Sequence, residues 1–217
     1  MSTDAPDPAA AGTDGPSGVE TELRLRPAPP AAAFDAARAR LVARAAVDGL
    51  VDVAYEDHET PLGVVRIGAT RRGIVRLLLP AEDHDLGLQE LADQVSPRIV
   101  RTSTPGLTTA RRELDEYFAG DRRGFDVPVD WALTRAFRRE VLRATAAIPY
   151  GGTSTYRGVA TAAGSPGAVR AAGTALARNP VPILVPCHRV LRTDGGLGQY
   201  RGGVAAKERL LALEQAA

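Results

Sequence analysis

The stretch Asn179–Val190 constrains this chain more than any other. It reads Asn-Pro-Val-Pro-Ile-Leu-Val-Pro-Cys-His-Arg-Val and contains the single cysteine of the 217 residues. A run rich in β-branched residues and interrupted by prolines favours a short buried or half-buried extended segment. Such a segment would carry the thiol of Cys187 into a pocket beside His188, since a neighbouring imidazole lowers the pKa of a thiol. The alternative is an inert buried cysteine that only fills space.

Residues 51–131 have the pattern of a small α+β domain. Three segments alternate as strands do, and Arg71-Arg72-Gly73 supplies a turn between the last two: residues 51–55, 63–69 and 74–79. Two further segments favour helices, near residues 83–95 and 107–119, and Gly120 is placed to end the second. The sequence therefore predicts a small sheet with helices packed on it.

The flanking regions differ in composition. Residues 1–32 are mostly Ala, Pro, Gly, Asp and Ser, which cannot offset the entropy of ordering, so they predict a disordered tail. Residues 33–50 are rich in helix formers, with Gly49 placed to stop an added helix. A second, mostly helical domain is predicted at 132–217, where apolar residues recur at helical spacing: Phe137, Val141, Leu142 and Ala144.

Two short helices are predicted next to each other in this second domain. Residues 153–164 have an N-cap in Ser154 or Thr155 and a stop in Gly164, and Ser165-Pro166 then begins a helix that ends at Arg178. A helix, a brief turn and a helix form a helix-turn-helix. One face of the second helix is apolar and small: Val169, Ala172, Gly173 and Leu176. Another face bears Arg170, Thr174 and Arg178, so the helix can approach DNA with few groups that read bases.

Charge is unevenly divided along the chain. Residues 135–217 carry 12 basic and 4 acidic residues, whereas the preceding part carries 15 basic and 22 acidic. A basic half beside an acidic half indicates that one half meets a polyanion.

A lone cysteine permits no internal disulfide and fits a reducing cytosol. The acidic start of the chain lacks the features of a signal peptide, and we find no apolar stretch long enough to span a membrane, so we expect a cytoplasmic protein with no membrane partner. One cysteine and three histidines exclude a multi-cysteine zinc site, and we expect no metal and no cofactor. His58 and His84 lie among acids near predicted loops and are interpreted as surface residues.

The segment from Tyr156 to Glu214 resembles the O6-alkylguanine-DNA alkyltransferases, also called methylated-DNA–protein-cysteine methyltransferases. The resemblance is carried by Pro-Cys-His-Arg-Val with Asn-Pro upstream; it is dense over residues 134–215 and thin before them. It implies DNA repair by stoichiometric, single-turnover transfer of the alkyl group of O6-alkylguanine, and of O4-alkylthymine, from double-stranded DNA to Cys187. It also implies a ribonuclease-H-like N-terminal domain with an antiparallel sheet, binding in the minor groove and base flipping. We expect a monomer.

The resemblance also implies residue roles by matched position. His188 accepts the thiol proton through a water, and Asn179 ties the motif turn to the active site. Glu214 orients the imidazole; it lies four residues after Leu210, on the inward side of a predicted C-terminal helix. The remaining roles are base flipping by Tyr156 and Arg170, and a substrate pocket formed by Tyr156, Leu176, Val190 and Tyr200.

Two positions depart from parts of the family. Leu176 stands where some members have methionine, and Arg201 stands where some have serine, which leaves the accepted alkyl size open.

A non-catalytic alkylated-DNA-binding protein is the main alternative function, and Cys187 argues against it. A cysteine hydrolase is disfavoured, because it needs an oxyanion hole and a histidine remote in sequence, and the adjacent Cys187-His188 pair has poor geometry for that arrangement. A transcription regulator is disfavoured by the sparsely polar second helix.

Overall fold

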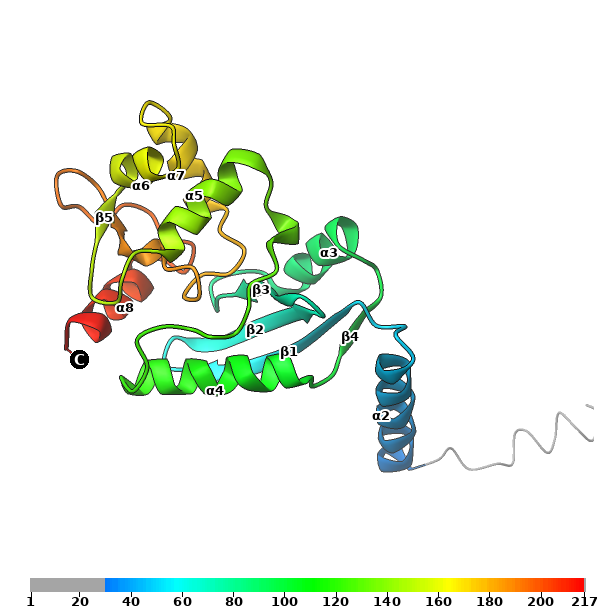
Figure 1. The fold of residues 1–217 in the computed structure, drawn as a ribbon. Coiled ribbons are helices and arrows are strands. Elements are labelled where there is room, and N and C mark those ends of the chain that lie inside the picture. The colour runs from blue at the N-terminus through cyan, green and yellow to red at the C-terminus, as the bar shows by residue number, and fades with distance from the viewer. Residues whose placement is uncertain (1–29, 217) are drawn as a thin grey trace, which may run out of the picture. The chain divides into compact units, whose positions relative to one another are not determined.

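The computed structural model describes residues 30–216 (Figure 1). The predicted disordered tail therefore lies outside the described residues, except at its end. Helix α2 occupies Ala31–Val47, and Gly49 follows it with φ 73°, a left-handed conformation that favours glycine after a helix. No helix in the described part is both long and apolar enough to cross a bilayer.

A mixed sheet of four strands forms the N-terminal half of the remaining chain. The strands are β1 (Val53–Thr60), β2 (Gly63–Thr70), β3 (Gly73–Leu78) and β4 (Ile99–Arg101), in the order β3-β2-β1-β4. The first three are antiparallel as predicted, whereas β4 runs parallel to β1. Strand β4 was not predicted, because three residues are too few to show an alternation of apolar and polar side chains.

Helices cover both faces of this sheet. Helix α4 (Pro105–Ala119) packs on one face, where Leu114 joins Ile67 and Ile74 in the main core. Helix α3 (His84–Gln94) lies on the other face, where Leu91 meets Val53 and Val75. Gly120 ends α4 with φ 84°, as predicted. The helix starts two residues before its predicted start near 107: Thr104 caps it with a bond from the Leu107 amide, and Pro105 begins it.

The two histidines outside the cysteine motif are not free surface residues. His58 lies within β1, and its Nε2 is 2.8 Å from Oδ1 of Asp115 on α4. His84 begins α3, with Nε2 3.2 Å from the carbonyl oxygen of Leu79. Both side chains are half-buried, so each is partly exposed and also contacts a neighbouring part of the fold. His58 lies in a strand because β1 runs well beyond its predicted end at residue 55.

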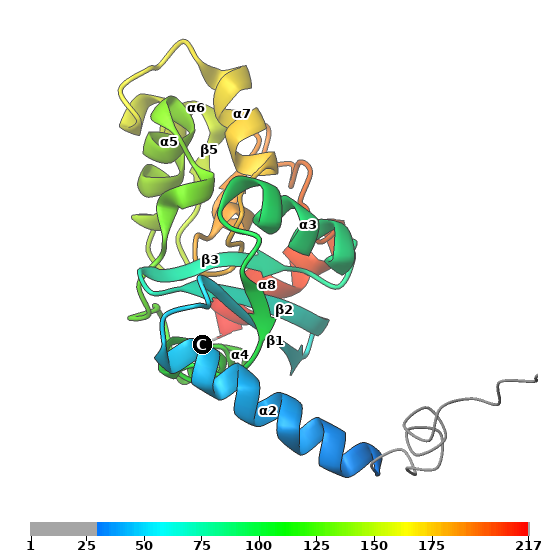
Figure 2. The same ribbon diagram turned by 90° about the vertical axis from the view of Figure 1, so that its right-hand side faces the viewer.

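The C-terminal half is mostly helical. It contains α5 (Ala136–Ala146), α6 (Tyr156–Ala162), α7 (Val169–Ala177) and α8 (Val204–Ala216). Helices α5, α6 and α7 lie together and away from the sheet in both ribbon views (Figures 1 and 2). Two short parallel strands, β5 (Ser154–Thr155) and β6 (Val190–Leu191), tie the start of α6 to the chain just after Cys187.

Helix α7 begins three residues later than predicted. Ser165 and Pro166 form a turn closed by the Ala168 amide, which donates to the Ser165 carbonyl at 2.9 Å, and Ala168 is the N-cap without a side-chain bond. The prediction was wrong because a Ser-Pro pair suits a turn as well as a helix start. The faces are as expected: Ala172 and Leu176 are buried, and Arg170 and Thr174 are exposed.

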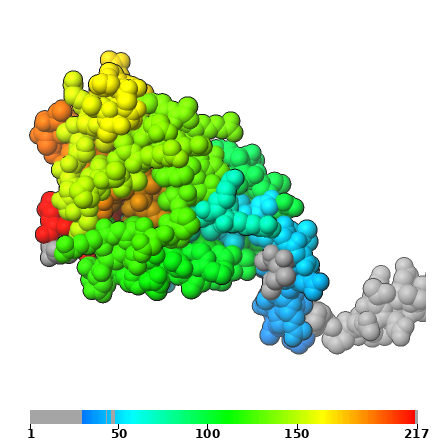
Figure 3. Space-filling view, in the orientation of Figure 1, coloured from blue at the N-terminus to red at the C-terminus, as the bar shows by residue number. Residues whose placement is uncertain are grey.

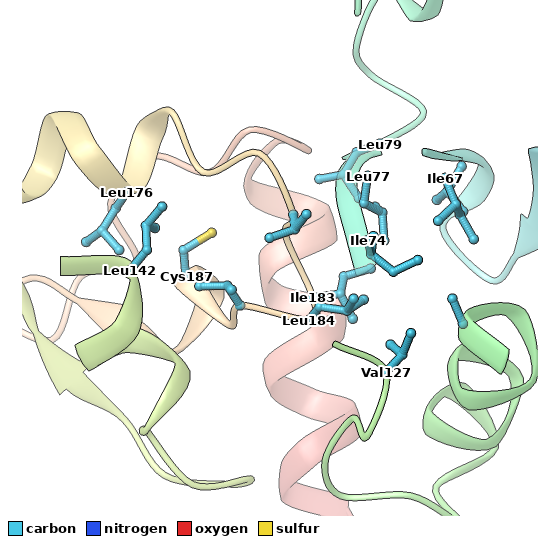
Figure 4. Packing of buried hydrophobic residues seen from close by; sticks show 14 of the residues in the cluster. Ile67, Ile74, Leu77, Leu79, Val127, Leu142, Leu176, Ile183, Leu184 and Cys187 are labelled. Carbon is cyan, nitrogen blue, oxygen red and sulfur yellow. The ribbon is translucent and has the colours of Figure 1, made fainter. Parts of the chain in front are cut away.

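The chain around Cys187 joins the two halves along the outer edge of the sheet. On β3 the Leu77 amide donates to the Pro180 carbonyl at 2.8 Å. Nearer the start of β3, the Ile74 amide donates at 2.8 Å to the carbonyl of Pro128, in the segment that follows α4. Figure 4 shows Ile183 and Leu184 between Leu77 and Ile74 of the sheet on one side and the helical half on the other. In the space-filling view, α4 and the yellow-green helices α5 and α6 leave only part of the chain around Cys187, coloured orange, visible on that face (Figure 3).

Candidate active site

The segment that carries Cys187 is buried as predicted, but it is a turn and not an extended run. The Val185 amide donates to the Val181 carbonyl at 2.9 Å, Ile183 has φ 73°, and a single 3₁₀ turn spans Cys187–Arg189. Proline amides cannot donate, so a strand ladder is unavailable here. Backbone strain of about 1–3 kcal/mol at a residue such as Ile183 persists only where the surroundings enforce it.

Asn179 enforces this turn and also contacts the thiol. Its Oδ1 accepts from the Val181 amide at 3.1 Å, and its Nδ2 donates to the Val185 carbonyl at 2.8 Å. The same Nδ2 lies 3.2 Å from Sγ of Cys187. Burial raises the pKa of the Cys187 thiol above 9.0, and the Asn179 bond only partly opposes this. The resting thiol is therefore protonated at neutral pH and needs a base.

His188 follows Cys187 directly, and Glu214 holds its ring. Both side chains are buried, with His188 Nε2 2.8 Å from Glu214 Oε1. Since an ionised carboxylate only accepts, Nε2 carries the proton and Nδ1 keeps a free lone pair. Burial lowers the pKa of His188 below 6.5 despite the carboxylate, so the imidazole is neutral at pH 7. No residue in the described part hydrogen-bonds Nδ1.

Glu214 is ionised because several donors converge on it. Burial alone would raise its pKa, but bonds from His188 and Arg189 outweigh burial and lower the pKa to about 2. Arg189 donates from Nε at 2.8 Å and from a terminal nitrogen at 2.9 Å, and Tyr117 donates at 2.7 Å. The Gly151 amide adds a bond of 3.2 Å. A fully partnered buried carboxylate is the arrangement that can orient a general base.

Beside the thiol is a pocket of about 410 Å³. Its lining brings together four of the residues expected from the sequence: Tyr156, Leu176, Cys187 and Tyr200. The Tyr200 hydroxyl is buried without a partner in the described residues, and burial raises its pKa well above 10.0, so it stays protonated as a donor. The pocket thus has an apolar wall, a nucleophile and a hydroxyl.

Arg170, predicted for base flipping, and Val190, predicted for the substrate pocket, both lie outside the lining of this pocket. Arg170 is exposed on α7 and borders a neighbouring hollow of about 500 Å³, which Tyr156 also borders. Val190 is fully buried, and its carbonyl accepts from Nζ of Lys207 at 2.7 Å. Val190 was predicted to form part of the substrate pocket, but its carbonyl is engaged by a lysine and its side chain faces the core.

Three buried side chains near the site had no predicted role: Tyr117, Arg189 and Lys207. A sequence pattern could have indicated Arg189 and Lys207. Arg189 lies within the cysteine motif, and Lys207 shares one inward face of α8 with Leu210 and Glu214. Tyr117 had no such pattern, because it reaches Glu214 from 97 residues away. Among the described residues, no three His, Cys, Asp or Glu side chains are grouped as a metal site would need.

Comparison with known proteins agrees with these features. Residues 53–131 match the ribonuclease-like domain of 6-O-methylguanine DNA methyltransferase, and residues 136–216 match its DNA binding domain. The constitutive methylated-DNA–protein-cysteine methyltransferase of Bacillus subtilis is 40% identical over 148 residues, which are 68% of this chain and 86% of that protein. The Methanosarcina barkeri protein of this name is 35% identical over 164 residues, 74% and 96% of the two chains.

Solved structures give the same result. The crystal structure of Mycobacterium tuberculosis O6-methylguanine methyltransferase matches with a TM-score of 0.64 at 32% identity, over 76% of this chain and 93% of that one. The structure of Mycobacterium tuberculosis OGT in complex with DNA matches with a TM-score of 0.62 at 33% identity, over 75% and 93%. With its two domains matched in order and a relative covered over most of its length, this chain belongs to the 6-O-methylguanine DNA methyltransferase family.

Proposed function

We propose that this protein repairs DNA by moving the alkyl group of O6-alkylguanine onto Sγ of Cys187. The observation that supports this most is the position of the Cys187 thiol in a pocket, next to neutral His188. Nε2 of this histidine is held by the ionised, buried carboxylate of Glu214. O4-alkylthymine is a second proposed substrate. The proposed setting is the cytoplasm, with the protein acting as a monomer.

The chemistry is a displacement at the alkyl carbon. The thiol proton passes to Nδ1 of His188, through a water, as sulfur forms a bond to the alkyl carbon. The bond from that carbon to O6 breaks, and its electron pair stays on the guanine. A hydrogen bond from the Tyr200 hydroxyl stabilises the departing oxygen. The product thioether is not a leaving group in water, so each protein reacts once.

DNA binding is assigned to α6 and α7 as a helix-turn-helix in the minor groove. An O6 substituent inside a duplex cannot reach a buried thiol, so the nucleotide must be flipped out of the stack. Tyr156 borders both the cysteine pocket and the hollow beside Arg170. This supports a role for Tyr156 in rotating the nucleotide and for Arg170 in filling the gap that the base leaves.

Intact mass after incubation with an O6-methylguanine duplex tests the proposal. One added methyl is expected on the native protein and none on Cys187→Ala, while the variant should keep its binding to the alkylated duplex. Binding without any added mass on the native protein would leave a non-catalytic damage-binding protein. Methyl transfer by Cys187→Ala would show that another residue is the nucleophile.

A further inference from the structure

Arg201 lines the cysteine pocket, but its charge is paired outside the helical half. Its Nε lies 2.5 Å from Oε1 of Glu82, in the loop between β3 and α3. The exposed fractions of the two side chains are 28% for Arg201 and 9% for Glu82. One wall of the pocket that holds Cys187 and Tyr156 is therefore held by a carboxylate from the sheet domain.

Glu82 itself is fixed in place. Its Oε2 accepts from the Leu79 amide at 2.9 Å, and its own amide donates to the Leu79 carbonyl at 2.9 Å. A terminal nitrogen of Arg76 lies 3.7 Å from Oε1 and is closer, at 2.9 Å, to Oε2 of Glu90. The carboxylate is thus a rigid point of attachment, and Arg76 has a second acid when Glu82 is lost.

The backbone of Arg201 has little freedom. The Gly203 amide donates to the Tyr200 carbonyl at 3.0 Å, which closes a turn with Arg201 and Gly202 at its centre. A Cβ on Gly202 would lie 2.8 Å from Cδ1 of Leu79, so this turn rests directly on the end of the sheet. What can change is the direction of the Arg201 side chain, either toward Glu82 or across the pocket.

We propose that Glu82 is a positioning residue that sets which alkyl groups the pocket accepts. It holds the Arg201 guanidinium against the sheet domain and so keeps the pocket open for groups larger than methyl. Glu82 is the only acid paired with Arg201 in the described part of the chain. Without it the guanidinium turns into the pocket, toward the thiolate that forms at Cys187. This inference rests on the proposed function.

The test compares alkyl transfer from two duplexes that differ only in the lesion, O6-methylguanine or O6-benzylguanine. Glu82→Gln keeps the size of the side chain; its carbonyl oxygen accepts the Leu79 amide, and its amide group then faces Arg201. We expect the ratio of benzyl to methyl transfer rates to fall by roughly 10-fold, the usual scale for a misfit in an apolar pocket. DNA binding affects both rates alike and leaves the ratio unchanged.

Two variants make the test specific. Glu90→Gln removes the other acid beside Arg76 without touching Arg201, and it should leave the ratio as in the native protein. In an Arg201→Ala background, Glu82→Gln should no longer change the ratio. An unchanged ratio in Glu82→Gln, an equal fall in Glu90→Gln, or a fall that persists without Arg201 would each overturn the inference. Failure of the native protein to take up either group would instead overturn the proposed function.

Discussion

Glu214 is the residue on which separate parts of the molecule meet. Its two oxygens accept from Tyr117 on α4, from the Gly151 amide, and from His188 and Arg189 of the cysteine motif. Removing one partner of a buried ion pair costs more than the pair itself contributes, because the remaining charge stays buried. Glu214 should therefore matter for stability as well as for chemistry.

Glu214→Gln is expected to lower the free energy of unfolding by about 3–5 kcal/mol, because the buried Arg189 guanidinium loses its anion. Alkyl transfer should slow by roughly 100-fold or more, since His188 loses the group that fixes its tautomer. Denaturant unfolding and single-turnover kinetics measure the two effects. Glu208→Gln, an exposed glutamate on the same helix, should change stability by less than about 0.5 kcal/mol. Equal effects of the two substitutions would contradict the assignment.

The rate of transfer should be nearly independent of pH through the physiological range and should fall only on the acidic side. Burial lowers the pKa of His188 below 6.5 and raises the pKa of Cys187 above 9.0. Neutral His188 is the proposed base, so the rate should be nearly constant between these values and fall on acidification below 6.5. Single-turnover rates from pH 5 to 9 measure the profile. A rate that rises as pH falls would rule out His188 as the base.

Stability should fall on acidification for a related reason. The pKa of Glu214 is lowered from 4.5 to about 2 in the folded protein, so the unfolded chain binds a proton first. That contribution, on the order of 3 kcal/mol, is present above pH 4.5 and is lost as pH approaches 2. His188, with its lowered pKa, acts in the same direction below 6.5. Thermal melts from pH 7 to 3 should show a falling midpoint, and a flat profile would contradict the linkage.

At the scale of elements, α7 differs from a helix that reads sequence. Its described surface consists of small residues with Arg170 near its start and Arg178 just past its end. Such a helix can lie close to DNA while making few contacts with base edges. We therefore expect α7 to contribute more to opening the duplex than to selecting a DNA sequence.

Arg170→Ala should slow repair of a duplex substrate much more than it slows attack on free O6-benzylguanine, because a free base needs no flipping. Rates for the two substrates, measured side by side, give the comparison. Arg178→Ala removes the same charge at the other end of α7, away from the hollow that Arg170 borders, and should have the smaller effect on the duplex rate. Equal losses on duplex and free base in Arg170→Ala would place this residue in folding or in the chemical step.

Elements with strong local signals were predictable from the sequence, and those set by distant contacts were not. Helix α4 ends at Gly120 as expected, and α8 places Leu210 and Glu214 inward as its spacing indicates. The turn at Asn179–Pro186 was mistaken for an extended segment, because an apolar run with prolines does not reveal that an asparagine side chain supplies its missing hydrogen bonds. No local pattern could show that Tyr117 reaches Glu214 or that Glu82 pairs with Arg201.

At the scale of the whole molecule, the sheet domain contributes directly to the active site. The Tyr117 hydroxyl donates to Glu214 at 2.7 Å, and its ring is fully buried against Phe125 and Tyr150. A hydrogen bond to a charged group contributes about 1.5–3 kcal/mol, compared with about 0.5–1.5 kcal/mol for a neutral acceptor.

Tyr117→Phe should therefore destabilise the protein by about 2 kcal/mol and slow alkyl transfer, although Tyr117 lies outside the helical half. Tyr150→Phe is the matched control, because the Tyr150 hydroxyl donates to the neutral Leu213 carbonyl at 3.3 Å. It should cost less stability and leave the transfer rate near that of the native protein. Denaturant melts and single-turnover rates for both variants decide the matter. Similar losses of stability and transfer rate in the two variants would mean that the hydrogen bond from Tyr117 to Glu214 contributes no more than a bond to a neutral acceptor.

The bond from the Leu77 amide to the Pro180 carbonyl protects the outer edge of the sheet. β3 is an outer strand of the sheet, and unpaired outer strands are templates on which other chains add and aggregate. The turn that presents the thiol is therefore also a cover that keeps this strand from pairing with other molecules. The same few residues thus present the reactive thiol and cover part of the outer edge of the sheet, next to the stretch that residues 128–130 cover.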